Sequence, residues 1–192
     1  MGFSSALRAF RVAGRFQSGR RAFLGKKYEK ALKYFQQAAQ RNPNYVFVSG
    51  NFREGIWTFI GRAQYNLERF AEARQSLERA VAANANDCLA KLFLGLTFAR
   101  EHEPAKGRRE LESGLRCLYG WIEQANSNDS FNAFWDPQRE IRAAVERCLA
   151  QISNNELDDQ TLIASGEWLG QRMEEEIDQV RRDENRRLSE QE

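Results

Sequence analysis

Apolar and small residues recur in this chain at helical spacing, in blocks that repeat along the sequence. Three blocks align with one another: Lys27–Leu32, Arg69–Arg74 and Glu103–Arg108. The last two blocks start 34 residues apart and the first two start 42 apart, so about eight residues are inserted between the first and the second. A repeat of this length predicts stacked helical pairs.

Three columns of this alignment hold only small residues. They are Gly19, Gly61 and Gly95; Ala31, Ala73 and Gly107; and Ala38, Ala80 and Gly114. Two antiparallel helices can cross closely where side chains are small, because glycine or alanine lets the backbones approach. Larger apolar residues fill the space around each crossing: Tyr28, Phe35, Trp57, Ile60, Phe70, Leu77, Leu94, Phe98 and Leu111. One pair cannot bury its faces alone, so the pairs are expected to stack into a solenoid.

The order of small and aromatic positions, closed by a proline, resembles the tetratricopeptide repeat. The first unit carries it best, over Tyr28–Ala38 and up to Pro43, and the second has Trp57 and Gly61 near its start. The third diverges, since Tyr119 stands where the closing proline is expected. The resemblance implies an all-α fold, a helical solenoid of three helix-turn-helix repeats with a C-terminal helical cap.

The resemblance and the patterns on either side of it divide the chain into four parts. Residues 12–121 are the three repeats, and residues 1–11 precede them as a basic amphipathic arm. Residues 122–136 are an aromatic loop, which includes Phe131 and Phe134. Residues 137–192 are two helices that cap the open end of the solenoid, followed by a frayed charged tail beyond Arg181.

The C-terminal helices have their own sequence signals. Asp136-Pro137 is a typical helix start, with Asp136 as the N-cap. The final helix places one apolar stripe on one face, formed by Leu162, Leu169, Met173, Ile177 and Val180. Its other face is acidic, from Glu174 to Asp178. As an alternative to the cap, this last helix reaches out and docks on a partner.

Charge is distributed unevenly although the formal net charge is only +2. Residues 1–30 hold eight basic side chains against one acidic, and residues 150–192 hold five basic against twelve acidic. Two readings stay open: both ends are solvated faces, or a basic arm meets an anionic surface and an acidic helix meets a basic partner.

Cys88, Cys117 and Cys148 are an odd, widely spaced set. They predict neither a disulfide framework nor a zinc site, and indicate a reducing compartment. The sequence has no apolar run long enough for a membrane span and no secretory signal. We therefore expect a cytoplasmic protein, with peripheral attachment to a membrane or an organelle location as alternatives.

No group of residues suggests catalysis. His102 is the only histidine and falls in the turn of the third unit, so it belongs to no Ser-His-Asp or Cys-His arrangement. The sequence predicts no enzyme, no metal site, no cofactor and no small-molecule substrate.

The resemblance implies that the first helix of each unit lines a concave groove where protein partners bind. The groove-facing positions are Phe16, Arg20, Phe23, Phe59, Arg62, Tyr65 and Phe93. Arg20 and Arg62 occupy the same column, so two guanidinium groups are expected to line up beside aromatic rings. This combination suits an extended or helical partner segment with acidic and apolar residues.

The N-terminal arm has three open interpretations. Arg8, Arg11 and Arg15 lie off the apolar face of Phe3, Leu7, Phe10 and Gly14. The arm is an extra helix packed on the first repeat, an anchor to an anionic membrane surface or partner, or an organelle transit segment.

These features predict a non-catalytic interaction scaffold, a subunit or assembly factor that docks onto a larger complex through its groove. The alternative is a peripheral membrane adaptor anchored by the N-terminal arm. Nucleic acid is not the expected partner, because the C-terminus is acidic.

Overall fold

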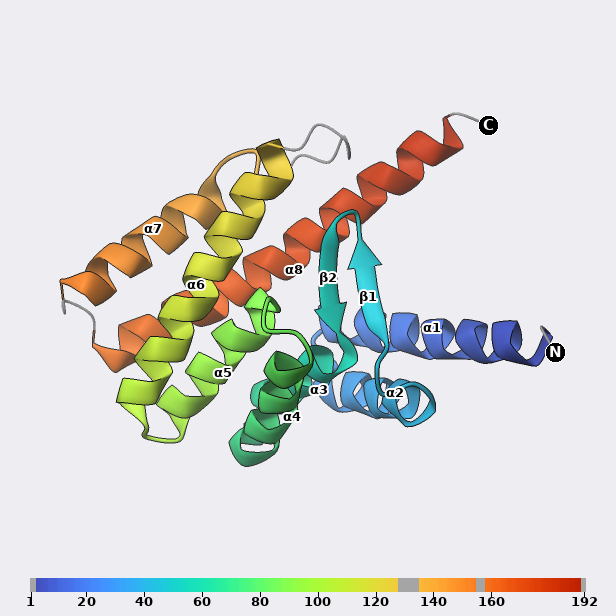
Figure 1. Cartoon of the computed structure of the whole chain (residues 1–192), viewed down its shortest axis with the longest axis horizontal. Coiled ribbons are helices and arrows are strands. Elements are labelled where there is room, and N and C mark those ends of the chain that lie inside the picture. The colour runs from blue at the N-terminus through green and yellow to red at the C-terminus, as the bar shows by residue number, and fades with distance from the viewer. Residues whose placement is uncertain (1–2, 128–134, 155–157, 191–192) are drawn as a thin grey trace.

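The structure, a computed structural model, describes residues 3–127, 135–154 and 158–190, with side chains from residue 10 onward except that of residue 188. In these ranges it is almost entirely helical (Figure 1). Its elements are α1 (Phe3–Leu24), α2 (Tyr28–Arg41), β1 (Val46–Ser49), β2 (Phe52–Gly55), α3 (Ile56–Asn66), α4 (Phe70–Ala83), α5 (Cys88–Arg100), α6 (Pro104–Ser127), α7 (Glu140–Ser153) and α8 (Asp159–Ser189).

The predicted three helical pairs are present as α1 with α2, α3 with α4, and α5 with α6. The turn inside each pair has one residue in the left-handed region: Lys26 at φ 56°, Glu68 at φ 59° and His102 at φ 61°. After it, the backbone N–H of Lys27, Arg69 or Glu103 donates to a carbonyl five residues earlier, in α1, α3 or α5. The same turn at three aligned places confirms the helical repeat.

The small columns lie at the helix crossings, as the alignment predicts. A Cβ added to Gly61 would lie 2.5 Å from Leu77 Cγ, and one added to Gly95 would lie 2.4 Å from the backbone nitrogen of Leu111. A Cβ added to Gly114 would lie 2.6 Å from the backbone nitrogen of Leu92. Larger side chains would force these helices apart.

The insertion between the first two units forms a β-hairpin, which the sequence reading missed. β1 and β2 pair antiparallel, with Ser49 opposite Phe52. Phe47 and Phe52 point into the core, while Val46 and Val48 are exposed. Phe52 packs against Trp135, and Phe47 packs against Phe16. A two-stranded hairpin is marginal alone, so packing against the repeats accounts for its presence here.

The segment after the third unit differs from the expected loop. α6 continues to Ser127, and α7 begins at Glu140 rather than at Pro137. Phe131 and Phe134 of the predicted aromatic loop lie outside the described residues. The N-cap residue of α7 is Arg139, and not Asp136 as the sequence predicts. The carboxylate of Asp136, at φ 49°, nevertheless accepts bonds from the backbone N–H groups of Ile141 and Arg142 in the first turn, both at 3.0 Å.

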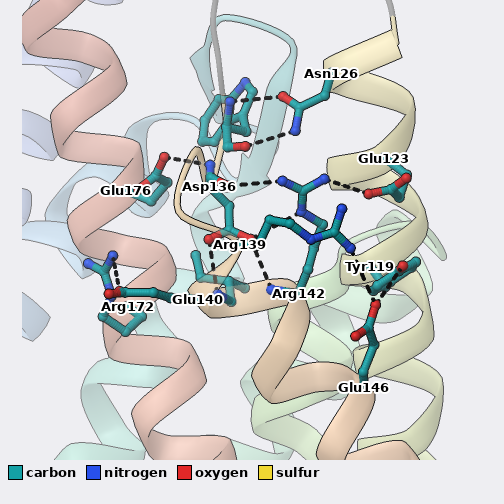
Figure 2. A network of polar contacts seen from close by, with 12 residues as sticks. Tyr119, Glu123, Asn126, Asp136, Arg139, Glu140, Arg142, Glu146, Arg172 and Glu176 are labelled. Carbon is teal, nitrogen blue, oxygen red and sulfur yellow. Dashed lines mark hydrogen bonds and ion pairs between the residues drawn. The ribbon is translucent and has the colours of Figure 1, made fainter.

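A polar network joins α6, α7 and α8 at this point (Figure 2). Arg142 lies between the carboxylates of Asp136, at 3.2 Å, and Glu123, at 2.6 Å. Glu176 of α8 accepts the backbone N–H of Asp136 at 2.7 Å. Burial raises the pKa of Glu176. Arg142, Asp136, Glu123 and Glu176 thus bind one another, and these bonds hold the segment before α7 in place.

The two C-terminal helices take different places. α7 packs against α6 at the end of the repeats, where a cap was expected. α8 instead crosses the side of the repeats formed by their first helices, and it contacts α5, α7 and β1 (Figure 1). It remains helical to Ser189, beyond the expected fraying point, with local ion pairs between Arg182 and Asp178 and between Arg186 and Asp183.

The expected separation of an N-terminal arm from the first repeat is not visible in the backbone. α1 runs without a break from Phe3 to Leu24, across the division after residue 11. Phe10 is 80% exposed, and in Figure 1 this end of α1 projects beyond α2. Whether residues 1–11 act as a separate functional unit stays a prediction.

Two cysteines correct the expectation that the chain has no disulfide. Cys88 at the start of α5 and Cys117 in α6 form a disulfide bond. Residues 29 positions apart meet because α5 and α6 are antiparallel, a juxtaposition that widely spaced cysteines do not reveal in sequence. Cys148 is free and buried. Among the described residues, no helix is long and apolar enough to cross a membrane.

Two glycines of α6 provide a matched test of the helix crossings. Gly114→Ala should lower the free energy of unfolding by about 1–3 kcal/mol, because the new methyl group meets the backbone of α5. Gly120, where a Cβ meets nothing within 4 Å, is the control. Gly120→Ala should raise stability by up to about 1 kcal/mol through helix propensity. Chemical denaturation of both variants measures this, and equal effects would reject the crossing.

Reduction of the disulfide should destabilise the chain. A closed loop of this size contributes about 3–4 kcal/mol in the chain-entropy account, which corresponds to a fall in melting temperature on the order of 10 °C. Thermal melts with and without a reductant measure the fall. The double variant Cys88→Ser with Cys117→Ser is the control and should not respond to the reductant. A native chain with both thiols free under air would contradict the pairing.

Candidate protein-binding groove

The predicted groove residues lie on one side of the repeats, but they are not open to solvent. α1 supplies Phe16, Arg20 and Phe23, at spacings of four and three residues that share a helix face. α3 supplies Phe59, Arg62 and Tyr65, each three residues after the last, and α5 supplies Phe93. All seven side chains are buried.

α8 covers this face. Its apolar stripe, Leu162, Leu169, Met173, Ile177 and Val180, is buried. Two glycines on α8 make a close approach to α5 possible: a Cβ on Gly166 would lie 2.8 Å from Leu96, and one on Gly170 would lie 2.6 Å from the Phe93 ring. The final helix therefore occupies the groove, where the sequence reading expected a partner.

Glu174 of α8 joins the two groove arginines. Arg20 Nη2 lies 2.8 Å from Glu174 Oε1, and Arg62 Nη1 donates to Glu174 Oε2 at 3.0 Å. Arg20 is also 3.5 Å from Asp178, one turn further along α8. The aligned arginines thus act on one carboxylate, which belongs to the same chain.

Glu54 of the hairpin adds a second buried carboxylate. Arg62 Nη1 donates to Glu54 Oε1 at 2.8 Å. Arg62 thus contacts two buried acidic side chains, Glu54 and Glu174. Further out, Asp87 caps α5 and accepts bonds from Thr58 Oγ1 at 2.7 Å and from the backbone N–H of Gly55 at 3.2 Å. Three buried acids therefore surround the end of β2 and the start of α3.

Aromatic rings enclose the arginines. The guanidinium carbon of Arg62 lies 5.0 Å from the ring centre of Phe23 and 5.1 Å from that of Phe93. That of Arg20 lies 4.9 Å from the ring centre of Phe47. Arginine stacks well on aromatic faces, so the predicted mixture of arginine and aromatic residues forms the floor on which α8 lies.

The environment separates the pKa values of the two acids. Burial raises the pKa of Glu54 to about 8, against the opposing charge of Arg62. Burial also acts to raise the pKa of Glu174, but Arg62 and Arg20 together outweigh it and hold that pKa below its ordinary value. Glu174 is consequently the carboxylate that keeps its charge between the arginines.

The polar centre is incompletely satisfied within the described part of the chain. Arg20 Nε, Arg62 Nε and Glu54 Oε2 are buried and have no hydrogen-bond partner there. Buried polar atoms are normally paired, and an unpaired one is unfavourable. The interface between α8 and the repeats is therefore well filled by apolar groups and less well matched at its polar centre.

A second carboxylate of α8 is held two turns before Glu174. The hydroxyl of Tyr65 donates to Glu167 Oε1 at 2.5 Å, and Arg100 Nη2 donates to the same oxygen at 2.7 Å. Burial, followed by the bond to Glu167, raises the pKa of Tyr65. Glu167 and Glu174 are thus each held by side chains of the repeats.

An open cleft remains beside α8, at the turns of the first two repeats. Its volume is about 640 Å³. Phe23, Tyr28 and Phe93 line it from the repeats, and Trp168 lines it from α8. Trp168 is 44% exposed, and Leu24 on the same rim is 38% exposed.

The acidic residues of α8 do not form the outer face that the sequence indicated. Glu174 points into the groove and Glu176 points to Asp136, so both are buried, while Glu175 is exposed. The basic N-terminal and acidic C-terminal parts of the chain therefore contact each other inside the molecule, through the buried ion pair of Arg20 and Glu174. The sequence did not indicate that Glu54 belongs to the groove, because it lies in a short strand whose neighbours show no helical periodicity.

The arginines of the N-terminal arm are separate from this centre. Arg11 is exposed, and Arg15 is partly buried and donates to Gln37 of α2. The side chain of Arg8 lies outside the described residues. Binding of an anionic surface by these arginines stays a proposal.

Comparison with known proteins supports the repeat reading. A family profile of the tetratricopeptide repeat matches residues 22–94, from the end of α1 into α5. The matched stretch holds Arg62, Phe93 and the hairpin, but not α8. A comparison with curated protein sequences finds no significant match.

The raised pKa of Glu54 predicts a pH dependence of stability. Because the folded state binds this proton more tightly than the unfolded state, its contribution is complete below about pH 4.5 and is lost as the pH rises toward 8. Denaturation curves from pH 5 to 8 should show stability falling, and Glu54→Gln should flatten the fall. A variant whose profile parallels that of the parent would show that Glu54 is charged throughout.

Proposed function

This chain carries tetratricopeptide repeats, and we propose that it is a non-catalytic interaction scaffold, a subunit or assembly factor that docks onto a larger complex. Repeats of this type bind protein partners. The partner is an acidic, apolar protein segment, and the surface is the concave side of the repeats. No nucleic acid, cofactor or small-molecule substrate takes part.

One observation carries this proposal: Arg20 and Arg62 hold a helix by its carboxylate among aromatic rings. The groove therefore has the chemistry to recognise an amphipathic acidic helix, because α8 is one. Arginine and aromatic side chains also carry much of the binding energy at protein interfaces in general. Trp168 of α8 and Leu24 of α1 are exposed at the same cleft. They form an apolar rim where a partner can make its first contact.

Site-directed photo-crosslinking tests the function. A photoreactive amino acid in place of Leu24, which lies on the cleft rim and belongs to the repeats, should capture one recurring protein in cells that make the chain. The same amino acid in place of Val48, which is 49% exposed on the hairpin, is the control for a similar exposure elsewhere. Capture only from position 48 would move the interface to another face. No protein captured from either position would contradict a scaffold.

A peripheral membrane adaptor is the second candidate, favoured by Phe10. This ring is 80% exposed next to the exposed Arg11, on the projecting end of α1 (Figure 1). An apolar ring beside basic residues suits the surface of an anionic membrane. Flotation with anionic liposomes separates the candidates, because deletion of residues 1–11 abolishes flotation only for the adaptor.

The compartment depends on the disulfide. Disulfides persist in oxidising compartments, whereas cytoplasmic thiols are kept reduced. The cytoplasmic location expected from the sequence therefore requires Cys88 and Cys117 to be thiols in the cell. Trapping thiols at the moment of lysis distinguishes the two states.

A further inference from the structure

The contacts of α8 define what the groove accepts. Glu167 and Glu174, seven residues apart, are each bound by two side chains of the repeats. Gly166 and Gly170 let the helix approach α5. An amphipathic helix with two carboxylates two turns apart, and small residues beside the first of them, reproduces these contacts.

The fit of α8 is good at the apolar stripe and poor at the polar centre. Arg20 Nε and Arg62 Nε remain buried without a partner although a carboxylate lies between the two guanidinium groups. Glu54 Oε2 is unpaired beside them. A helix that paired these atoms would bind more tightly than α8. It would keep the apolar contacts and remove the free-energy cost of burying polar atoms without hydrogen-bond partners.

The cleft provides the entry point. It opens between α8 and the turns of the first two repeats, and Tyr65 and Glu174 line it. A partner can therefore touch the Phe23 and Phe93 side of the groove while α8 is still docked. Displacement can then proceed along the helix without the whole groove first being exposed.

We propose that α8 is an exchangeable occupant of the groove, and that the partner is an amphipathic helix with two carboxylates at this spacing which takes its place. This inference rests on the proposed function. It specifies the chemistry of the partner and says how access to the groove is regulated. In the free chain α8 closes the groove. Since α8 is tethered, it competes at an effective concentration in the millimolar range, so a partner binds tightly only when α8 is loosened or outmatched.

A peptide with the sequence of residues 159–189, labelled with a fluorophore, tests the exchange on the full-length chain. The parent should bind it weakly, because its own α8 competes. Glu174→Gln in the chain removes the charge that holds α8, and the unaltered peptide should then bind roughly a hundredfold more tightly. Glu175→Gln is the matched control, since Glu175 is the neighbouring, exposed glutamate, and it should bind like the parent.

A second variant is designed to release α8 from the groove without changing a charge. Gly170→Leu places a side chain against the Phe93 ring and should expel α8, while all repeat residues stay as they are. Hydrogen exchange should show loss of protection over residues 159–189 in both variants and retained protection over α3 and α5. Peptide binding should leave α3 and α5 protected and should slow exchange further on their groove side.

Three results would overturn the inference. In the first, α8 loses protection and the peptide still does not bind. In the second, α8 stays as protected in both variants as in the parent. In the third, the repeats themselves unfold when α8 is released, which makes α8 an inseparable part of the fold. These outcomes involve only this chain and the peptide, so they are independent of whether crosslinking finds a cellular partner.

Discussion

The arrangement of this molecule depends on the carboxylate of Glu174 lying between Arg20 and Arg62. Two guanidinium groups from neighbouring repeats are removed from water here, and a buried charge without a counter-charge costs several kcal/mol. The first helices of the repeats can pack this closely only if acidic groups come to the same place. α8 and the hairpin supply them, through Glu174 and Glu54. That requirement determines where both elements lie.

The hairpin is best understood from this centre. It interrupts the repeat between the first and second units, yet it ends directly at the start of α3, where Glu54 reaches Arg62. The guanidinium carbons of Arg20 and Arg181 lie 4.9 and 5.4 Å from the centre of its Phe47 ring. The insertion thus gives the groove a wall, a buried hydrogen-bond acceptor for Arg62 and a contact with α8, which a repeat of ordinary length would lack.

Features that recur at helical or repeat spacing were predictable from the sequence. The small columns and the shared column of Arg20 and Arg62 follow from local geometry, and the structure places all of them on the expected faces. The hairpin was missed because four-residue strands carry little signal. The pairing of Cys88 with Cys117 and of Glu174 with the arginines was missed because each joins residues of different elements. The acidic run of α8 showed charge, but not which glutamate turns inward.

A groove with two buried arginines cannot stay empty at no cost. If α8 leaves, Arg20 and Arg62 face water across an apolar, aromatic surface that the chain alone does not cover. Any molecule that binds there must therefore supply both an apolar stripe and a carboxylate, which excludes most peptides and favours helices like α8. Binding at this groove is then an exchange of one helix for another. Its strength is the difference between two similar interfaces, so small changes at the polar centre should decide which helix is held.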